Sequence, residues 1–277
     1  MRIAYLSDLH IEFENATGRS AAQASGGPLA PALEQALEPA KGADLVLLAG
    51  DIDVGVVAIV QADAIARHLG APVVCVAGNH EAYGQDLAAL LPRMRTTAWE
   101  TDGRVIFLDC SVVRLWFKGR AVCVLGCTLW TDYALNGDPS AAMQSADKEM
   151  SDHQEIGWNG GVFHPTDALA LHRDHRAWLS AQIRKLNEET PRPEILIVTH
   201  HAPCRDALGE RVLSLGPSYV SDMGPELSAW APLTWIHGHT HHRHLTKIGT
   251  ATIASAPRGY PGQAHGVRGY RCGILSL

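Results

Sequence analysis

Apolar and polar positions divide the first third of the chain into short apolar runs separated by segments of helical periodicity. The runs are almost continuously apolar, which is typical of strands covered on both faces, and they predict strands at 2–7, 44–49 and 72–77. The intervening segments, which end near Gly and Pro residues, predict helices at 31–40, 57–69 and 85–95. This alternation of strands and helices predicts a layered α/β fold.

The rest of the chain is predicted to contain more strands and one long helix. Three apolar runs with hairpin-like spacing predict strands at 105–108, 112–116 and 121–125. A long amphipathic pattern predicts a helix at 167–189, and further strands are expected at 194–198, 233–236, 245–247, 251–255 and 273–277. Loops rich in small residues are expected at 14–28 and from Ala202 to about Met223.

Residues 131–165 have the least regular pattern, with a helix predicted only around 141–150. We interpret this segment as a cap or lid over a site, because long irregular segments in compact domains are often functional. The alternative is an inert surface excursion. No repeat and no domain boundary interrupts the pattern, so residues 1–277 are predicted to form a single domain.

Composition narrows the class of protein. With 277 residues, of which 46% are apolar, the chain can bury a sizeable core. Its formal charge of −6 disfavours nucleic acid as a partner, because nucleic-acid-binding surfaces are usually strongly basic. No apolar run approaches the ~20 residues of a membrane span, and the first residues lack the pattern of a signal peptide. The six cysteines show no C-x-x-C spacing, so we expect free thiols in a cytoplasmic protein without a membrane partner.

Polar side chains follow five of the predicted strands. The motifs are Asp8-Leu9-His10, Gly50-Asp51, Gly78-Asn79-His80-Glu81, His200-His201 and Gly238-His239-Thr240-His241. Sites in α/β sheets form at the carboxyl ends of strands, so these side chains are expected at one edge. His239 and His241 are two residues apart and point to the same side of an extended segment, as a pair of metal ligands requires.

Each motif alone is a weak signal. The D-x-H motif is also an ordinary polar strand end, and histidine-rich tracts also occur on solvated loops. Together the five motifs supply carboxylate, amide and imidazole ligands in the number that two metal ions with one shared carboxylate require. A mixture of nitrogen and oxygen ligands suits Mn, Fe or Zn better than Mg or Ca.

The order of the motifs from Asp8 to His241 resembles that of the calcineurin-like metallophosphoesterase superfamily. The resemblance implies a two-layered β-sandwich flanked by helices, in a four-layer α/β/β/α arrangement, and a binuclear metal centre. It implies that one metal ion is bound by Asp8, His10, Asp51 and His241. It also implies that the second is bound by Asp51, Asn79, His200 and His239, with Asp51 bridging.

The resemblance extends to the chemistry of the site. It implies that His80 acts as the general acid or as a phosphate clamp, and that substrate contacts come from Asn79, His80 and Arg243. The motif G-D-x-x-D-R-G of protein Ser/Thr phosphatases is absent, because Val54 stands three positions after Asp51. A protein phosphatase is therefore disfavoured, and the residue that supports His80 is not identified.

Other polar residues near the motifs are also interpreted, some as structural residues and some as candidates for substrate binding. Glu81 is expected to orient its loop by hydrogen bonds. Arg243 and Arg258 are candidates for binding the substrate phosphate, with a solvated surface role as the alternative.

His201 is expected beside the ligands or in the core, and His237 is expected to pack. His242 and His244 are expected around the ligands or on the surface. His172 and His175 have the i, i+3 spacing of a metal pair, but we expect them on the surface because no acidic residue completes a site there.

These observations predict a metal-dependent phosphoric ester hydrolase for a small phosphomonoester or phosphodiester, in which a metal-activated hydroxide attacks phosphorus. The expected cofactors are two ions of Mn, Fe or Zn, and we expect Mn²⁺ to support activity in vitro. The alternatives are a nuclease of the same superfamily and a non-catalytic, metal-stabilised scaffold that binds a protein partner. The sequence does not determine the substrate or the oligomeric state.

Overall fold

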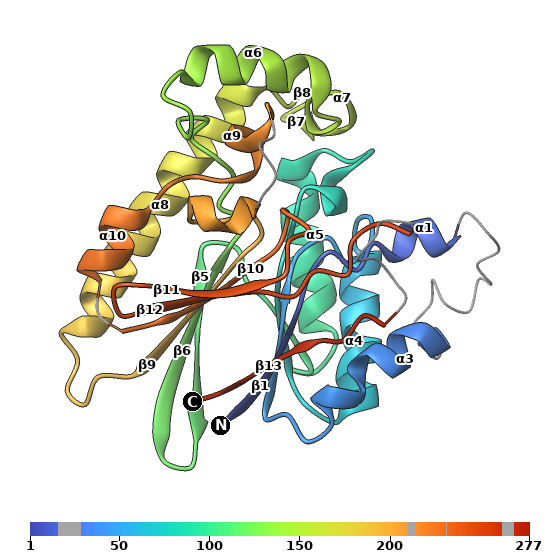
Figure 1. Ribbon diagram of the computed structural model, residues 1–277. Helices are drawn as coiled ribbons and strands as arrows, with labels where there is room; N and C mark the ends of the chain where they lie inside the picture. The colour runs from blue at the N-terminus through green and yellow to red at the C-terminus, as the bar shows by residue number, and fades with distance from the viewer. Residues whose placement is uncertain (16–28, 210–213, 231, 262–268) are drawn as a thin grey trace.

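The computed structural model describes residues 1–15, 29–209, 214–230, 232–261 and 269–277. Most of the loop predicted at 14–28 lies outside these residues, as does part of the loop predicted before Met223. The described chain forms two β-sheets that pack face to face and carry helices on both outer faces (Figure 1).

Both sheets are built mainly from parallel strands. The first has the order β13-β1-β2-β3-β4, in which β1 (Arg2–Leu6), β2 (Leu45–Ala49), β3 (Val73–Val76) and β4 (Val105–Phe107) are parallel and β13 (Gly273–Ser276) is antiparallel. The second has the order β11-β12-β10-β9-β6-β5. Its parallel strands are β6 (Arg120–Cys127), β9 (Glu194–Thr199), β10 (Thr234–His237) and β12 (Ala251–Ser255), between the antiparallel edges β5 (Ser111–Phe117) and β11 (His244–Ile248).

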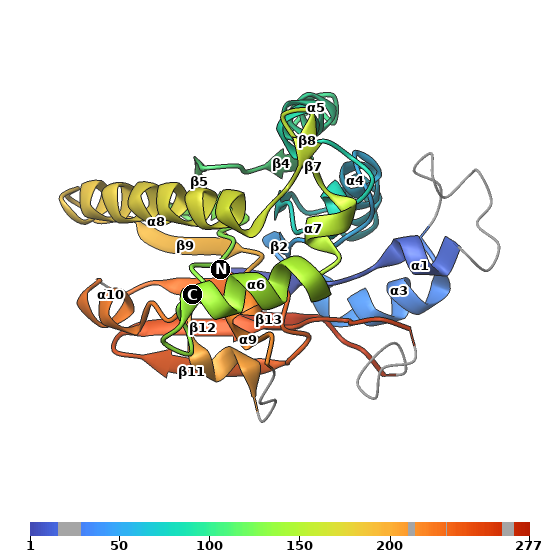
Figure 2. The ribbon, with the colours of Figure 1, turned by 90° about the horizontal axis from the view of Figure 1, so that it is seen from above.

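The helices form the two outer layers, which confirms the predicted four-layer arrangement (Figures 1 and 2). The first sheet is covered by α3 (Pro31–Leu37), α4 (Val57–Leu69) and α5 (Leu87–Trp99). The second is covered by α8 (Pro165–Asn187) and α10 (Gly224–Ala229). Shorter helical segments are α1 (Ile11–Asn15), η1 (Glu38–Ala40), η2 (His80–Ala82), η3 (Arg205–Leu208) and α9 (Gly216–Tyr219).

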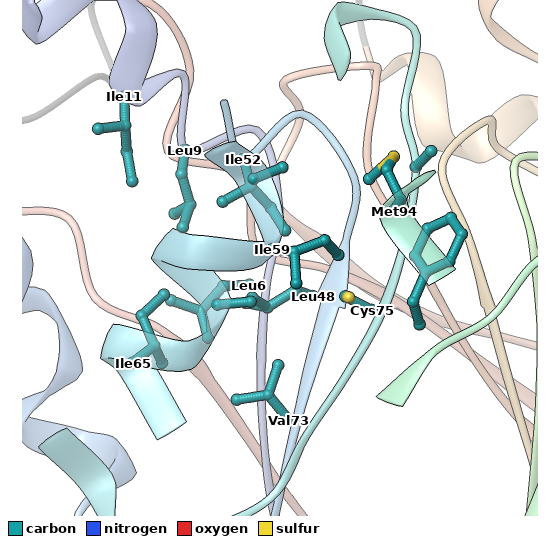
Figure 3. Close-up of a cluster of buried hydrophobic side chains, with 14 of the residues drawn as sticks. Leu6, Leu9, Ile11, Leu48, Ile52, Ile59, Ile65, Val73, Cys75 and Met94 are labelled. Carbon is teal, nitrogen blue, oxygen red and sulfur yellow. The ribbon is translucent and has the colours of Figure 1, made fainter. Parts of the chain in front are cut away.

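Alternation along each strand divides its side chains between two apolar cores. In β1, Ile3 faces the second sheet, whereas Leu6 packs in the core beneath the helices of the first sheet. Figure 3 shows Leu6 with Leu48 of β2 against Ile59 and Ile65 of α4. Each of these aliphatic side chains is fully buried, and burial of one such group contributes about 1.5–3 kcal/mol. Strands covered on both faces therefore account for the nearly continuous apolar runs.

Two predictions about the elements are corrected by the structure. The run at 105–108 forms β4 in the first sheet, whereas β5 and β6 form a hairpin in the second, so the chain changes sheets between Phe107 and Ser111. The described part of the segment expected as a loop before Met223 contains η3 and α9. Both η3 and α9 are four residues long, and their apolar residues pack against the core beneath the second sheet. Elements this short show no helical period in the sequence.

The prediction that His172 and His175 lie on the surface is wrong. Their exposed fractions are 1% and 6%, because α8 turns them toward the second sheet. They continue the spacing of three and four residues that places the apolar side chains Leu179, Ile183 and Leu186 on one face of the helix. That spacing is the signal in the sequence for their burial.

The segment 131–165 lies above the edge at which the parallel strands end (Figure 1). It contains α6 (Pro139–Glu149), α7 (Asp152–Glu155) and a small hairpin of β7 (Gly157–Trp158) and β8 (Gly161–Val162). Among the described residues, no helix has the length and apolarity needed to cross a lipid bilayer.

Candidate metal centre

The predicted metal ligands come together at the carboxyl edge of the parallel strands. Asp8 follows β1, Asp51 follows β2 and Asn79 follows β3 in the first sheet. In the second sheet, His200 follows β9 and His239 follows β10. Because the two sheets pack face to face, the two sets of strand ends meet across the interface between the sheets.

Most of the candidate ligands have a backbone conformation that is unusual for residues with a side chain. The φ angles are positive at Asp8 (52°), His10 (46°), Asp51 (53°), His239 (68°) and His241 (49°). Each such residue costs of the order of 1–3 kcal/mol and persists only where its surroundings hold it in place. These five ligands are among the twelve non-glycine residues with positive φ in the described part of the chain, and strain of this kind is common at functional sites.

One group of ligands consists of Asp8, His10 and His241, whose donor atoms lie within 4.8 Å of one another. Nε2 of His10 lies 3.1 Å from Nε2 of His241, and the latter lies 3.3 Å from Oδ1 of Asp8. Oδ2 of Asp8 is buried and has no hydrogen-bond partner. These atoms face a common point, as ligands of one cation do.

A second group consists of Asp51, Asn79, His200 and His239. Nε2 of His200 lies 2.9 Å from Oδ1 of Asn79, 3.1 Å from Nδ1 of His239 and 3.3 Å from Oδ2 of Asp51. All four residues are buried, and Nε2 of His239 has no hydrogen-bond partner. The second group therefore offers an amide oxygen, a carboxylate and two imidazoles at one point.

Asp51 lies between the two groups. Its Oδ2 atom is 3.7 Å from Nε2 of His10 in the first group and 3.3 Å from Nε2 of His200 in the second. Burial alone would raise the pKa of the Asp51 carboxyl, but the imidazoles of His200 and His80 outweigh it and hold that pKa well below its usual range. An ionised carboxylate between two clusters is the arrangement that a bridging ligand requires.

The chemistry of the donor atoms fits cations. Nδ1 of His10 lies 3.0 Å from the Glu12 carboxylate, and Nδ1 of His200 lies 2.8 Å from the carbonyl oxygen of Ala49. A proton on each of these nitrogens leaves Nε2 as a lone-pair donor that points into the site. Imidazole nitrogens that face one another at 3.1 Å, beside buried unpartnered atoms of Asp8 and His239, are suited to an ion between them.

Glu81 has the loop-orienting role predicted from the sequence. Its two carboxylate oxygens accept hydrogen bonds from the backbone N–H groups of Asp51 at 3.0 Å, Ile52 at 2.7 Å and Gly78 at 2.7 Å. Burial, followed by the charge of Asp51, raises the pKa of the Glu81 carboxyl to about 7. Gly78 permits this close approach of the two loops, since a Cβ atom there would overlap the Asp51 side chain.

The amide of Asn79 is oriented by a residue of the segment 131–165. Nδ2 of Asn79 donates a hydrogen bond to Oδ1 of Asp152 at 2.7 Å, and the Tyr83 hydroxyl donates to the same oxygen at 2.7 Å. Because both amide protons are directed to Asp152 and Tyr83, the carbonyl oxygen Oδ1 is left to face His200. No motif in the sequence signals this contact, which joins residues 73 positions apart.

His80 lies beside Asp51 and is supported by Glu12, which the sequence did not identify as its partner. Nδ1 of His80 lies 3.0 Å from Oε1 of Glu12, and Nε2 lies 3.0 Å from the hydroxyl of Tyr260. Burial lowers the pKa of His80, but the charge of Asp51 and the hydrogen bond to Glu12 outweigh it and raise the pKa to about 9. The one local signal for Glu12 is its place two residues after His10.

A cavity of about 200 Å³ opens onto these residues. Part of its wall is formed by Asp51, Asn79, His239 and His241. The rest comes mainly from tyrosines and from the segment 131–165, through Tyr83, Tyr219, Tyr260, Glu149, Met150 and Ser151. A ligand in this cavity would contact the candidate metal ligands directly.

Two arginines near the motifs differ in their surroundings. Arg243 is exposed, and its guanidinium donates to the carbonyl oxygens of Arg271 at 2.6 Å and Cys272 at 3.4 Å, so the structure does not place it with the predicted substrate contacts. Arg258 is buried and donates to the carbonyl oxygen of Leu9 at 2.9 Å, which excludes the alternative of a solvated surface residue.

The remaining histidines lie around the site. His201 and His237 are buried, as predicted, and the ring of His201 packs 4.1 Å from that of His239 between ring centroids. His242 and His244 are half-buried, and their rings stack with centroids 5.8 Å apart.

Comparison with known proteins agrees with this geometry. The family model for calcineurin-like phosphoesterases matches residues 1–243. The solved structure of phosphopantetheinyl hydrolase from Mycobacterium tuberculosis superposes with a TM-score of 0.66 at 15% identity, over 94% of this chain and 89% of that one. The protein TT1561 of Thermus thermophilus superposes with a TM-score of 0.52 at 13% identity, over 99% of this chain and 97% of that one.

The likeness to these two structures shows the fold, and no curated protein sequence matches the chain. The family match has a wider consequence, because it includes all the motifs from Asp8 to His241 that converge at the carboxyl edge. The chain is therefore a member of the calcineurin-like phosphoesterase family.

Proposed function

We propose that this protein hydrolyses a small phosphate ester at a binuclear metal centre. Membership of the family supports a metal-dependent phosphoesterase in general. The observation that carries the more specific proposal is the position of Asp51 between the two ligand groups, within 3.7 Å of His10 and 3.3 Å of His200. With Asp51 shared, each group has the number of ligands that one cation of Mn, Fe or Zn requires.

The cations and the residues around them would have separate roles in the reaction. Two bound cations would neutralise the phosphoryl oxygens and lower the pKa of a water molecule, which serves as the nucleophile. Glu12 fixes the rings of His10 and His80, and Asp152 fixes the amide of Asn79. The substrate phosphate is therefore bound at a site whose side chains are already oriented, and little reorganisation is needed during the reaction.

His80 is the residue placed to move a proton. The contact with Glu12 fixes the proton on Nδ1, so the protonated ring has Nε2–H free to donate. That nitrogen faces the hydroxyl of Tyr260 at 3.0 Å, at the wall of the cavity. A leaving-group oxygen that takes the place of this hydroxyl would receive the proton, which is general acid catalysis.

The cavity suits a small ester better than a polymer. Its volume of about 200 Å³ and its three tyrosines offer room and aromatic contact for a compact leaving group. A net charge of −6 gives no support to a nucleic-acid substrate. We therefore place a small phosphomonoester or phosphodiester ahead of nucleic acid.

A substrate panel on metal-defined protein tests the proposal. Protein stripped of metal and reloaded with Mn²⁺ is expected to hydrolyse p-nitrophenyl phosphate or bis(p-nitrophenyl) phosphate, and the preferred ester distinguishes a monoesterase from a diesterase. Asp51→Asn should abolish turnover. Asp44→Asn is the matched control, because Asp44 precedes the same strand at the opposite edge, where it accepts a hydrogen bond from the Arg2 N–H at 2.7 Å.

Two results would contradict the proposal. One is full metal occupancy without hydrolysis of either ester under Mn, Fe or Zn, which would favour a metal-stabilised scaffold. The other is degradation of single-stranded DNA at physiological salt with no turnover of the small esters, which would favour a nuclease. Equal loss of activity in Asp44→Asn and Asp51→Asn would mean that the effect is on folding.

A further inference from the structure

A second cluster of reactive side chains lies outside the metal centre, where β4 leads into β5. Donor atoms of Asp109, Cys110 and His175 lie within 4.8 Å of one another. Cys110 packs against the apolar core that contains Cys127, at the end of β6, and the Cys127 thiol acts on the pKa of the Cys110 thiol. Cys110 is partly exposed, whereas Cys127 has no exposed surface.

The two cysteines are the residues next to the last pair of the β5–β6 register. Ser111 of β5 pairs with Gly126 of β6, and one further step of this antiparallel register brings Cys110 to Cys127. Directly opposed residues have Cα atoms about 4.5–5.5 Å apart. A disulfide spans Cα separations of about 4.4–6.8 Å, a range that includes such opposed positions. Cys110 leaves the ladder with a φ of 42°, and its thiol still reaches that of Cys127.

The surroundings give the two thiols different roles. Nδ1 of His175 accepts a hydrogen bond from the N–H of Leu129 at 3.1 Å, so the ring carries its proton on Nε2, the nitrogen left to face Cys110. The hydrogen bond from Cys127, opposed by burial and supported by the hydrogen bond from His175, lowers the pKa of Cys110 to about 6.

The pKa of the other thiol, Cys127, is shifted in the opposite direction. Burial raises the pKa of Cys127 well above its usual range. The carboxylate of Asp109 also faces the cluster, and it is paired with the Arg95 guanidinium at 3.1 Å. At neutral pH, Cys110 is therefore an accessible thiolate and Cys127 a protonated thiol in contact with it.

We propose that Cys110 and Cys127 are a hydroperoxide-reactive pair that converts reversibly to a disulfide. The Cys110 thiolate attacks the terminal peroxide oxygen, the O–O bond breaks, and the leaving oxygen takes a proton from solvent. Cys110 is then a sulfenic acid. The Cys127 thiol gives up its proton and attacks the Cys110 sulfur, the S–O bond breaks, and water leaves as the S–S bond forms. Two electrons pass from the sulfur pair to the peroxide, and an external dithiol reverses the change.

Mass spectrometry of the full-length protein tests this directly. Trypsin releases Cys110 in the peptide 105–114, and both Cys123 and Cys127 in the peptide 121–148. Brief treatment with hydrogen peroxide, followed by alkylation of free thiols, is expected to give a cross-link between these two peptides that dithiothreitol reverses. The intact chain should lose two hydrogen atoms in mass.

Variants assign the bond. Cys127→Ala should remove the cross-link and leave a Cys110 sulfenic acid that dimedone traps, and Cys110→Ala, at the more exposed position, should remove both products. Cys123→Ala is the matched control, since Cys123 lies four residues earlier on the same strand and in the same apolar core. It should keep the cross-link. A cross-link that persists in Cys127→Ala, or the lack of any cross-link in the unaltered protein after peroxide, would overturn the proposal.

The pH dependence of alkylation provides a readout that simple proximity would not change. The rate at which iodoacetamide modifies Cys110 is expected to have its midpoint near pH 6, and His175→Ala should move that midpoint upward. A midpoint near the ordinary thiol value of about 8.5 in the unaltered protein would contradict the assigned roles.

Discussion

Replacing Glu12 with glutamine removes one negative charge that contacts two histidines of the metal centre at once. Oε1 of Glu12 lies 3.0 Å from Nδ1 of His10, a candidate metal ligand, and 3.0 Å from Nδ1 of His80, the candidate general acid. The side chain of Glu12 is 15% exposed and those of the two histidines are 0% and 6% exposed, so water screens these contacts weakly. Glu12→Gln therefore tests the orientation of a ligand and of an acid in one variant.

The size of the effect follows from the two contacts. Glutamine has nearly the same shape and keeps one oxygen, but it accepts without the charge. A hydrogen bond to a charged group contributes about 1.5–3 kcal/mol. Loss of one such contribution in the transition state lowers kcat/KM by about 10- to 100-fold, at about 1.36 kcal/mol for each factor of ten. Substitutions of residues that hydrogen-bond to metal-binding histidines typically lower metal affinity or activity by a factor of this size.

The assay is hydrolysis of the preferred p-nitrophenyl ester by Mn²⁺-loaded protein, with circular dichroism to check the fold. Glu34→Gln is the matched control, because Glu34 also faces a histidine, His68 at 4.0 Å, but on the surface with 43% of its side chain exposed. The control should stay within about twofold of the unaltered protein. A folded Glu12→Gln protein that keeps full activity, or the same loss in Glu34→Gln, would refute the role assigned to Glu12.

Three other predictions concern the same centre. Removal of metal by a chelator should lower the melting temperature, since ligand at about 100 times its Kd stabilises the folded state by about 2.7 kcal/mol; an unchanged melting curve would speak against resident ions. Asp152→Ala should weaken Mn²⁺ binding about tenfold by calorimetry, because the Asn79 amide is then free to turn, whereas the exposed Asp147→Ala on the same segment should not. The pKa of His80 is raised, so its proton, and the turnover that depends on that proton, are lost only at alkaline pH. Glu12→Gln should move this alkaline limb of the pH profile of kcat to lower pH. An unmoved limb would exclude His80 as the acid.

The layered fold could be predicted because each strand carries its own signal. Runs such as 44–49 are apolar on both faces, and both faces of that strand are buried in the structure. The exchange between sheets after β4 carried no such signal, since Val105–Phe107 looks the same whether it pairs with β3 or with β5. Strand partners depend on packing between segments far apart in the chain, which local patterning does not encode.

The convergence of the candidate ligands could likewise be predicted, because carboxyl ends of parallel strands meet at one edge. The loop-orienting role of Glu81 could be predicted too, but the roles of Glu12 and Asp152, which orient side chains of the site, could not. Glu12 reaches His80 over 68 positions and Asp152 reaches Asn79 over 73, and neither belongs to a strand-end motif. Arg243 shows the reverse case, since it closely follows the histidine motif and yet turns to the backbone of Arg271. The strand-end motifs identified the ligands, but they did not show where the side chains of neighbouring residues point.

The central claim is that two cations share the Asp51 carboxylate. Crystals grown with Mn²⁺ and measured at the manganese absorption edge test it most directly. We predict two anomalous peaks about 3.5–4 Å apart on either side of Asp51, one within bonding distance of Asp8, His10 and His241 and the other of Asn79, His200 and His239. A single peak, or peaks bound by residues that exclude Asp51, would contradict it.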